Sequence, residues 1–178
     1  MEKKKVLILH GWGGSDAPHW QAWLENELIN QDYEVSFPQL PNRDFPKFNE
    51  WFEFVCKEIE EFSPHIVVCH SLANIVWFHI LQKNDINPLE KLLLVAPVRK
   101  DCAIEEVGDF FPYKVPTDLK AKKALLIVST NDVYMNLHEA NELQHELNIE
   151  MDILENAGHI NADSGFGPLK EAIDWINE

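Results

Sequence analysis

The sequence predicts an α/β protein in which helices cover both faces of a mostly parallel, six-stranded sheet. Short β-rich apolar runs alternate along the chain with segments of helical periodicity, which is typical of parallel strands joined by helices. The runs are almost continuously apolar, as expected for strands buried on both faces. No repeat, low-complexity segment or linker divides the 178 residues, so we expect a single domain over residues 1–178.

Each apolar run is expected to form one strand, and the last run is the most polar of them. The runs cover residues 6–9, 34–37, 66–69, 92–95, 125–128 and 149–154. Apolar residues at helical spacing predict helices between and after these strands, and Pro18 suits the first turn of the first helix. The expected helices cover residues 20–29, 48–62, 72–80, 137–147 and 168–176.

The longest irregular connection covers residues 97–117, between the fourth and fifth expected strands. Loops of this length in a compact domain are usually functional or mobile. The connection contains Phe110 and Phe111. We expect these two rings, together with His10 at the end of the first strand, to line a substrate pocket.

Composition limits the classes of partner and the compartment. Lys and Arg number 15 against 30 Asp and Glu, and the resulting charge of −15 disfavours nucleic acid and anionic membranes, which attract basic surfaces. The apolar run from Val6 to Leu9 is too short for a secretory signal or a membrane span. Cys56, Cys69 and Cys102 are odd in number and lack metal-ligand spacing, so we expect reduced thiols in a cytoplasmic protein.

Ser71 is the candidate nucleophile, because the segment from Val67 to Ala73 leads from a β-rich run straight into a helical pattern. The segment resembles the G-x-S-x-G nucleophile elbow, a strained strand-to-helix turn that needs small residues on either side of the serine. Cys69 and Ala73 occupy the two glycine positions and depart from the motif. A serine that only caps the helix would explain the same placement.

His159 and Asp132 are the candidate general base and the acid that orients it. His159 follows the last expected strand, and an imidazole can accept a hydroxyl proton near neutral pH. Asp132 follows the fifth strand, at the edge where open α/β sheets gather their catalytic groups. A surface-loop histidine and ordinary turn chemistry are the alternatives for the two residues taken singly. The chain order of Ser71, Asp132 and His159 favours a triad over either alternative.

The glycine-rich segment from His10 to Gly14 follows the first strand and completes the candidate site. We assign an oxyanion hole to the backbone amides of Trp12 and Leu72, the second of which follows the nucleophile directly. The alternative is a phosphate-binding loop, but neither G-x-G-x-x-G nor a following G-K-[ST] is present.

The eight histidines lack the spacing of a metal site, because no H-E-x-x-H or H-x-H with nearby acids occurs. We therefore expect no metal and no cofactor. His70 adjoins Ser71, but successive side chains of a strand point to opposite sides, so we interpret His70 as a packing residue.

With these residues in place, the chain resembles the small serine hydrolases related to retinoblastoma-binding protein nine, including their bacterial YdeN-like branch. The most specific likeness is the segment from Ala157 to Gly167. The resemblance implies an α/β-hydrolase fold without a separate cap domain, and a Ser-Asp-His triad at Ser71, Asp132 and His159. It also implies that the second strand lies at one sheet edge, followed by the first, third, fourth, fifth and sixth.

The resemblance further implies hydrolysis of a small-molecule ester or amide by acyl transfer, without naming the substrate. The alternative is a non-catalytic module that keeps the fold and binds a partner in the cleft or on a helix. The animal namesake carries an L-x-C-x-E motif for binding pocket proteins, whereas this chain has Phe54 to Glu58 within a predicted helix. We interpret that segment as a helix and predict no particular protein partner.

Overall fold

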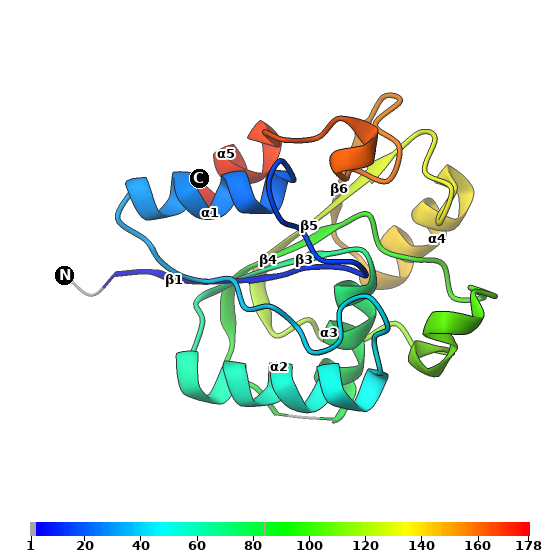
Figure 1. The fold of residues 1–178 in the computed structure, drawn as a ribbon, viewed down its shortest axis with the longest axis horizontal. Coiled ribbons are helices and arrows are strands. Elements are labelled where there is room, and N and C mark those ends of the chain that lie inside the picture. Colours follow the sequence, from blue (N-terminus) through cyan, green and yellow to red (C-terminus); the bar gives the residue numbers. More distant parts are fainter. Residues whose placement is uncertain (1–2, 84) are drawn as a thin grey trace.

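The computed structural model describes residues 3–83 and 85–178, so the first two residues of the charged amino-terminal segment lie outside it. Six strands form one sheet in the order β2-β1-β3-β4-β5-β6, and every neighbouring pair is parallel (Figure 1). The strands are β1 (Lys5–Leu9), β2 (Glu34–Ser36), β3 (Ile66–His70), β4 (Leu89–Val95), β5 (Ala121–Ser129) and β6 (Glu150–Leu154). The predicted fold class and strand order are confirmed.

Two strands begin three or more residues earlier than predicted. β4 begins at Leu89 and β5 at Ala121, and these two residues are paired across the ladder. The added part of β4 contains Lys91, and the added part of β5 contains Lys122 and Lys123. Backbone hydrogen bonds do not depend on side-chain polarity, so an apolar pattern locates only the buried part of a strand.

Five α-helices lie in the described residues. They are α1 (Trp20–Asn30), α2 (Phe48–Phe62), α3 (Leu72–Lys83), α4 (Leu137–Leu147) and α5 (Lys170–Asn177). Helices α1 and α5 cover one face of the sheet, whereas α2, α3 and α4 supply apolar side chains to the other (Figure 1). The segment from Phe54 to Glu58 is part of α2, as expected.

The helix boundaries follow from capping chemistry. Asn136 accepts a hydrogen bond from the Glu139 amide, and the Glu139 carboxylate accepts one from the Asn136 amide, so a capping box begins α4. The helix ends at Asn148, whose left-handed backbone is common after a last helical turn. In α1 the cap is a histidine, because His19 Nδ1 accepts from the Gln21 amide at 3.2 Å.

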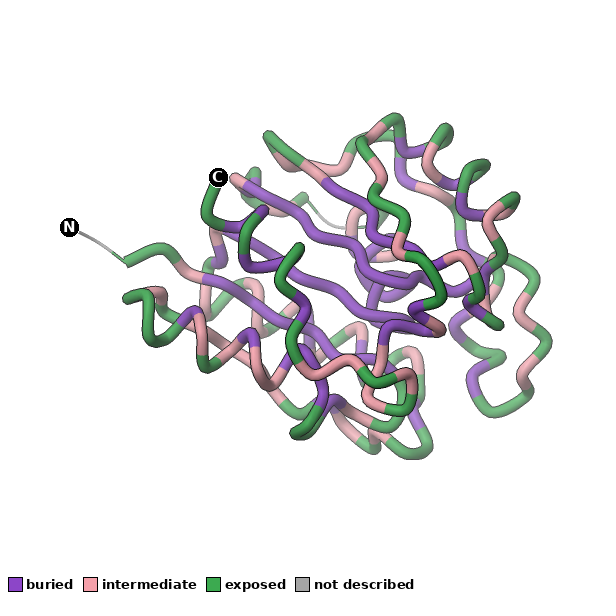
Figure 2. The backbone as a smooth tube through the Cα atoms, turned by 90° about the horizontal axis from the view of Figure 1, so that it is seen from above, coloured by how far each residue is buried: buried purple, intermediate pink, exposed green. Residues whose placement is uncertain are grey.

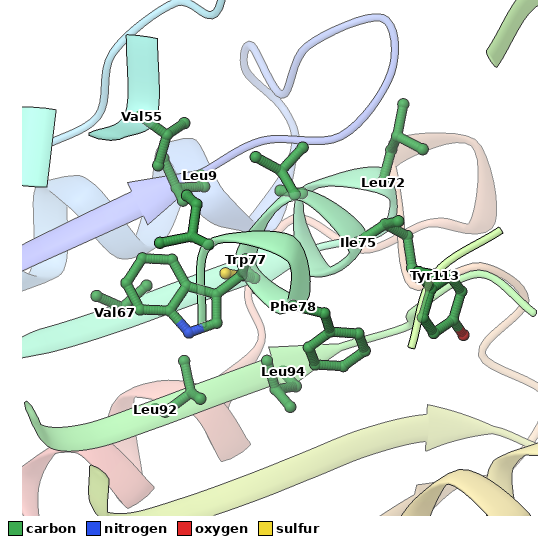
Figure 3. Close-up of a cluster of buried hydrophobic side chains, with 14 of the residues drawn as sticks. Leu9, Val55, Val67, Leu72, Ile75, Trp77, Phe78, Leu92, Leu94 and Tyr113 are labelled. Carbon is green, nitrogen blue, oxygen red and sulfur yellow. The ribbon is translucent and has the colours of Figure 1, made fainter. Parts of the chain in front are cut away.

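Alternation along the strands divides the core into two layers. Leu7 and Leu9 of β1 belong to the layer under α2 and α3, whereas Val6 and Ile8 face α1 and α5. The central strands β1, β3 and β4 are buried along nearly their whole length (Figure 2). Figure 3 shows one layer, in which side chains of α3 pack against strands β1, β3 and β4. A sheet covered on both faces leaves its carboxyl edge as the place where strand ends and loops meet.

No helix in residues 3–83 and 85–178 is both long enough and apolar enough to cross a membrane.

Candidate active site

The carboxyl edge of the sheet brings three predicted side chains into mutual contact. Ser71 follows β3, Asp132 follows β5 and His159 follows β6. The Ser71 hydroxyl donates to His159 Nε2 at 2.7 Å. On the other side of the ring, His159 Nδ1–H donates to the Asp132 carboxylate, at 2.8 Å to Oδ2 and 3.0 Å to Oδ1. All three residues are buried, so water competes little for these hydrogen bonds.

Ser71 occupies a strained turn between β3 and α3. Its φ of 54° lies in the left-handed region, which costs a non-glycine residue of order 1–3 kcal/mol unless the surroundings impose it. The Ser71 amide donates to the Val95 carbonyl at 3.0 Å. Asn74 Nδ2 donates to the carbonyls of both Ser71 and Val95. These bonds fix the backbone that presents the hydroxyl.

The turn leaves almost no room beside Ser71. A Cβ on Gly11 would lie only 2.7 Å from Ser71 Cβ, so glycine is required here by close approach. At the two motif positions that depart from glycine, Cys69 and Ala73 are both buried. Burial raises the pKa of the Cys69 thiol, which makes it a packing residue at neutral pH.

Asp132 combines turn chemistry with the contact to His159. Its Oδ1 accepts the Tyr134 amide at 2.9 Å, as in an Asx turn, while both oxygens face the imidazole. The Tyr134 ring packs edge-on against the His159 ring, with centroids 4.5 Å apart. The two readings of Asp132 are therefore compatible, because the turn holds the carboxylate in place.

Three consecutive side chains before Asp132 tie the loop that carries His159 to the end of β5. Each accepts a hydrogen bond from one of three consecutive backbone amides of that loop. The pairs are Asn156 N to Thr130 Oγ1 at 2.8 Å, Ala157 N to Ser129 Oγ at 2.9 Å, and Gly158 N to Asn131 Oδ1 at 2.7 Å. This ladder sets the distance between Asp132 and His159.

Ser164 supports His159 from the other side. Its hydroxyl oxygen accepts the His159 amide at 3.2 Å, and its hydroxyl donates to Asn161 Oδ1 at 2.8 Å. Gly158 has a φ of 56°, and a Cβ there would overlap the Ser164 side chain. The sequence reasoning missed Asn131 and Ser164, although both lie within the segments that carry the family likeness.

His70 and Trp20 hold the backbone on the carboxyl side of His159. His70 Nε2–H donates to the His159 carbonyl at 3.1 Å, and Trp20 Nε1–H donates to the Ile160 carbonyl at 2.9 Å. Burial lowers the pKa of His70, so the ring is neutral and keeps its single proton for this bond. Ile160 has a φ of 48°, rare for a β-branched residue, which the two bonds help to impose. The interpretation of His70 as a packing residue therefore left out a polar contact.

His19 is a second neutral histidine beside the site. Burial lowers its pKa to about 4. Because Nδ1 accepts the Gln21 amide, the proton of the neutral ring is on Nε2. The His19 ring packs against His70 at a centroid distance of 5.0 Å, and His70 in turn lies 5.3 Å from His159.

Two cavities meet at Ser71 and His159. One has a volume of about 210 Å³ and the other about 360 Å³. Trp12 lines both cavities, and Leu72 lines the smaller one. Among the described residues, neither the Trp12 amide nor the Leu72 amide donates to another backbone carbonyl. Leu72 begins α3, and the first amides of a helix have no partner within it.

The predicted pocket residues need correction. His10 and Phe110 are 0% exposed, and neither lines a cavity beside Ser71. His10 accepts the Leu40 amide on Nε2 and donates from Nδ1 to the Gly11 carbonyl, so it braces the glycine loop. Phe110 packs edge-on against Trp51 in the core. Phe111 contacts Tyr113 and is likewise absent from both linings.

Other residues of the same loop do line the smaller cavity, namely Val98, Cys102, Ile104 and Val107. The prediction that the loop walls a pocket thus had the right segment and the wrong side chains. The Phe110 ring is instead buried in the core.

In the part of the chain that the structure describes, no group of three or more His, Cys, Asp or Glu side chains is arranged to hold a metal ion.

The fold is that of an α/β hydrolase, with Ser71 at the turn from β3 to α3. The chain belongs to the serine hydrolase family, whose pattern it matches over residues 6–178. The chain is also similar to YdeN hydrolases, as the relatives described next show.

The relatives match nearly the whole chain at low identity. The YdeN protein of Bacillus subtilis (strain 168) is 23% identical over 97% of this chain and 94% of its own length. The crystal structure of the B. subtilis ydeN product has a TM-score of 0.88 at 21% identity, covering 98% of this chain and 97% of that one. A YdeN-like protein from Pectobacterium atrosepticum has a TM-score of 0.75 at 22% identity, covering 97% and 89%.

Proposed function

We propose that this hydrolase cleaves a small carboxylic ester or amide by acyl transfer, with Ser71 as nucleophile, His159 as general base and Asp132 as the orienting acid. The observation that carries the proposal is the continuous hydrogen-bonded chain from the Ser71 hydroxyl through both ring nitrogens of His159 to Asp132. A serine that only capped its helix would have no need of this contact.

In the first half of the reaction, Ser71 Oγ attacks the substrate carbonyl carbon while its proton passes to His159 Nε2. The resulting imidazolium is stabilised by the Asp132 carboxylate on Nδ1. The carbonyl oxygen becomes an anion, and we assign its stabilisation to the Trp12 and Leu72 amides. Each such donor is worth about 10²–10³ in rate in serine hydrolases that have been dissected this way.

The second half of the reaction returns the enzyme to its starting state. His159 gives its proton to the departing alcohol or amine, and the acyl group stays on Ser71 Oγ. Water then attacks the acyl carbon, loses a proton to His159 and releases the carboxylic acid. The Ser71 hydroxyl regains its proton, so no cofactor takes part in this scheme.

The decisive variant is Ser71→Ala, assayed on p-nitrophenyl acetate and on a fluorophosphonate probe. Turnover should fall by about 10³-fold or more, and labelling should vanish, with an unchanged far-UV circular dichroism spectrum. Ser63→Ala is the matched control, because Ser63 has a similar left-handed φ of 52°, is exposed at the end of α2 and lines neither cavity beside Ser71.

Two outcomes would contradict the proposal. Turnover that survives Ser71→Ala would exclude Ser71 as the nucleophile. A folded wild-type protein that reacts with neither reagent would favour a binding module that keeps the fold without catalysis.

A further inference from the structure

The two cavities that meet at Ser71 and His159 share Trp12, Asn161 and Asp163 and differ in their other side chains. The smaller one is walled by the apolar side chains of Leu72, Val98, Ile104 and Val107, together with Cys102. Tyr134, Asn161 and Asp163 supply its polar lining. The larger cavity is lined by residues 12–19 and by polar groups around His159. A bound substrate that spans the reacting carbonyl would therefore meet the apolar side chains of the long loop on one side and the segment of residues 13–19 on the other.

The larger cavity holds hydrogen-bonding groups without protein partners. The Ser15 hydroxyl is 2% exposed and has no hydrogen-bond partner in the described chain. The His19 ring lines the same cavity and carries its proton on Nε2, as shown above. Buried polar groups of this kind are usually satisfied, so a polar ligand group is the fitting occupant.

The volume of the smaller cavity limits what it can hold. A cavity of roughly 150 Å³ with apolar walls accommodates benzene. By that scale, the space of about 210 Å³ suits a chain of about six to eight carbons. Burying each methylene favours binding about fourfold.

Resting on the function proposed above, we propose that the substrate carries an apolar acyl chain of about six to eight carbons, seated in the smaller cavity. Its polar alcohol or amine occupies the larger cavity and leaves from there, protonated by His159. Cys102 and Ile104 are the specificity-determining residues for chain length, since both are only partly buried and line the apolar cavity from the long loop.

The first test is the dependence of kcat/KM on acyl length in p-nitrophenyl esters from acetate to laurate. The value should rise about fourfold per methylene up to hexanoate or octanoate and then fall. A flat series, or a decline from acetate onward, would overturn the assignment of the cavity.

Two substitutions in the loop should move this profile in opposite directions. Cys102→Trp should remove the gain for hexanoate, so that the ratio of the hexanoate to the acetate kcat/KM falls towards one. Ile104→Ala enlarges the cavity and should shift the optimum to longer chains, which keeps the test valid if the tryptophan variant fails to fold. Ala103→Trp is the matched control, because Ala103 is exposed between these residues and lines neither cavity. An unshifted profile in Ile104→Ala would contradict the proposal.

A pair of isomeric esters tests which side of the carbonyl enters the apolar cavity. Ethyl hexanoate and hexyl acetate contain the same atoms. We expect kcat/KM to be at least tenfold higher for ethyl hexanoate, because its acyl chain places four more methylenes in the cavity. A preference for hexyl acetate would refute the orientation. Failure of the wild type to react with any ester or fluorophosphonate would instead refute the hydrolase proposal itself, so the two failures are distinguishable.

Discussion

The glycine before Trp12, Gly11, offers the sharpest structural test of the turn that carries Ser71. In Gly11→Ala the new Cβ would lie 2.7 Å from Ser71 Cβ and 3.3 Å from Ser71 Oγ. Two carbon atoms in contact are separated by about 3.5–4.0 Å, so one of the two backbones must shift by about 1 Å. A displacement of about 1 Å in a catalytic group can cost about 10²-fold in rate.

We therefore expect kcat/KM for p-nitrophenyl hexanoate to fall about 100-fold in Gly11→Ala, which corresponds to about 2.7 kcal/mol of transition-state stabilisation. Labelling by a fluorophosphonate should slow by a similar factor. Gly108→Ala is the control, because a Cβ there would meet no atom within 4 Å. Turnover of Gly11→Ala within about threefold of wild type would refute the reasoning from close approach.

Three further predictions follow from the contacts around His159. Asp132→Asn should lower kcat by about 10⁴-fold with little change in KM, because an amide that donates to Nδ1 leaves the proton on Nε2; near-normal turnover would contradict this role. Trp20→Phe keeps an aromatic ring but loses the indole N–H that donates to the Ile160 carbonyl, and should lower kcat up to about tenfold at constant KM. A change in KM alone would argue against a positioning role. Burial holds the pKa of His19 at about 4 against an ordinary 6.5, so the unfolded chain takes up a proton first as pH falls. In urea denaturation, this group should therefore lower the free energy of unfolding by about 3 kcal/mol between pH 6.5 and 4. The loss should be smaller in His19→Asn, because asparagine keeps the helix cap but does not titrate. Equal losses in both proteins would refute this prediction.

The centre of the sheet was predictable because strands β1, β3 and β4 are buried on both faces. Runs such as Ile66 to Cys69 carry apolar side chains at every position, and that pattern leaves few other structures. Boundaries were less predictable where polar residues continue a strand, as at Lys91 in β4. Its ammonium group is accommodated because Nζ donates to the carbonyls of Trp175 and Ile176 at the end of α5.

The three candidate catalytic residues could be located from strand ends, since parallel strands bring their carboxyl ends to one edge. The groups that orient them could not. The contact of Asn131 with the Gly158 amide and that of Trp20 with the Ile160 carbonyl join segments far apart in sequence. A single sequence contains no sign of such pairings, because asparagine and tryptophan occur in many other roles.

The pocket prediction failed for a related reason. Large aromatic rings in a long loop suggested a pocket wall, but burial in the core stabilises a large ring most, and Phe110 is fully buried. The smaller side chains of Cys102 and Ile104 remained to line the cavity. Which side of a loop faces a site depends on packing that periodicity cannot describe.

The most direct measurement of the central claim is mass-spectrometric mapping of the adduct formed when the wild-type protein reacts with a fluorophosphonate. We expect one phosphonyl group per protein, attached to the Ser71 side chain. An adduct on any other residue, or an unmodified Ser71 in fully inactivated protein, would contradict it.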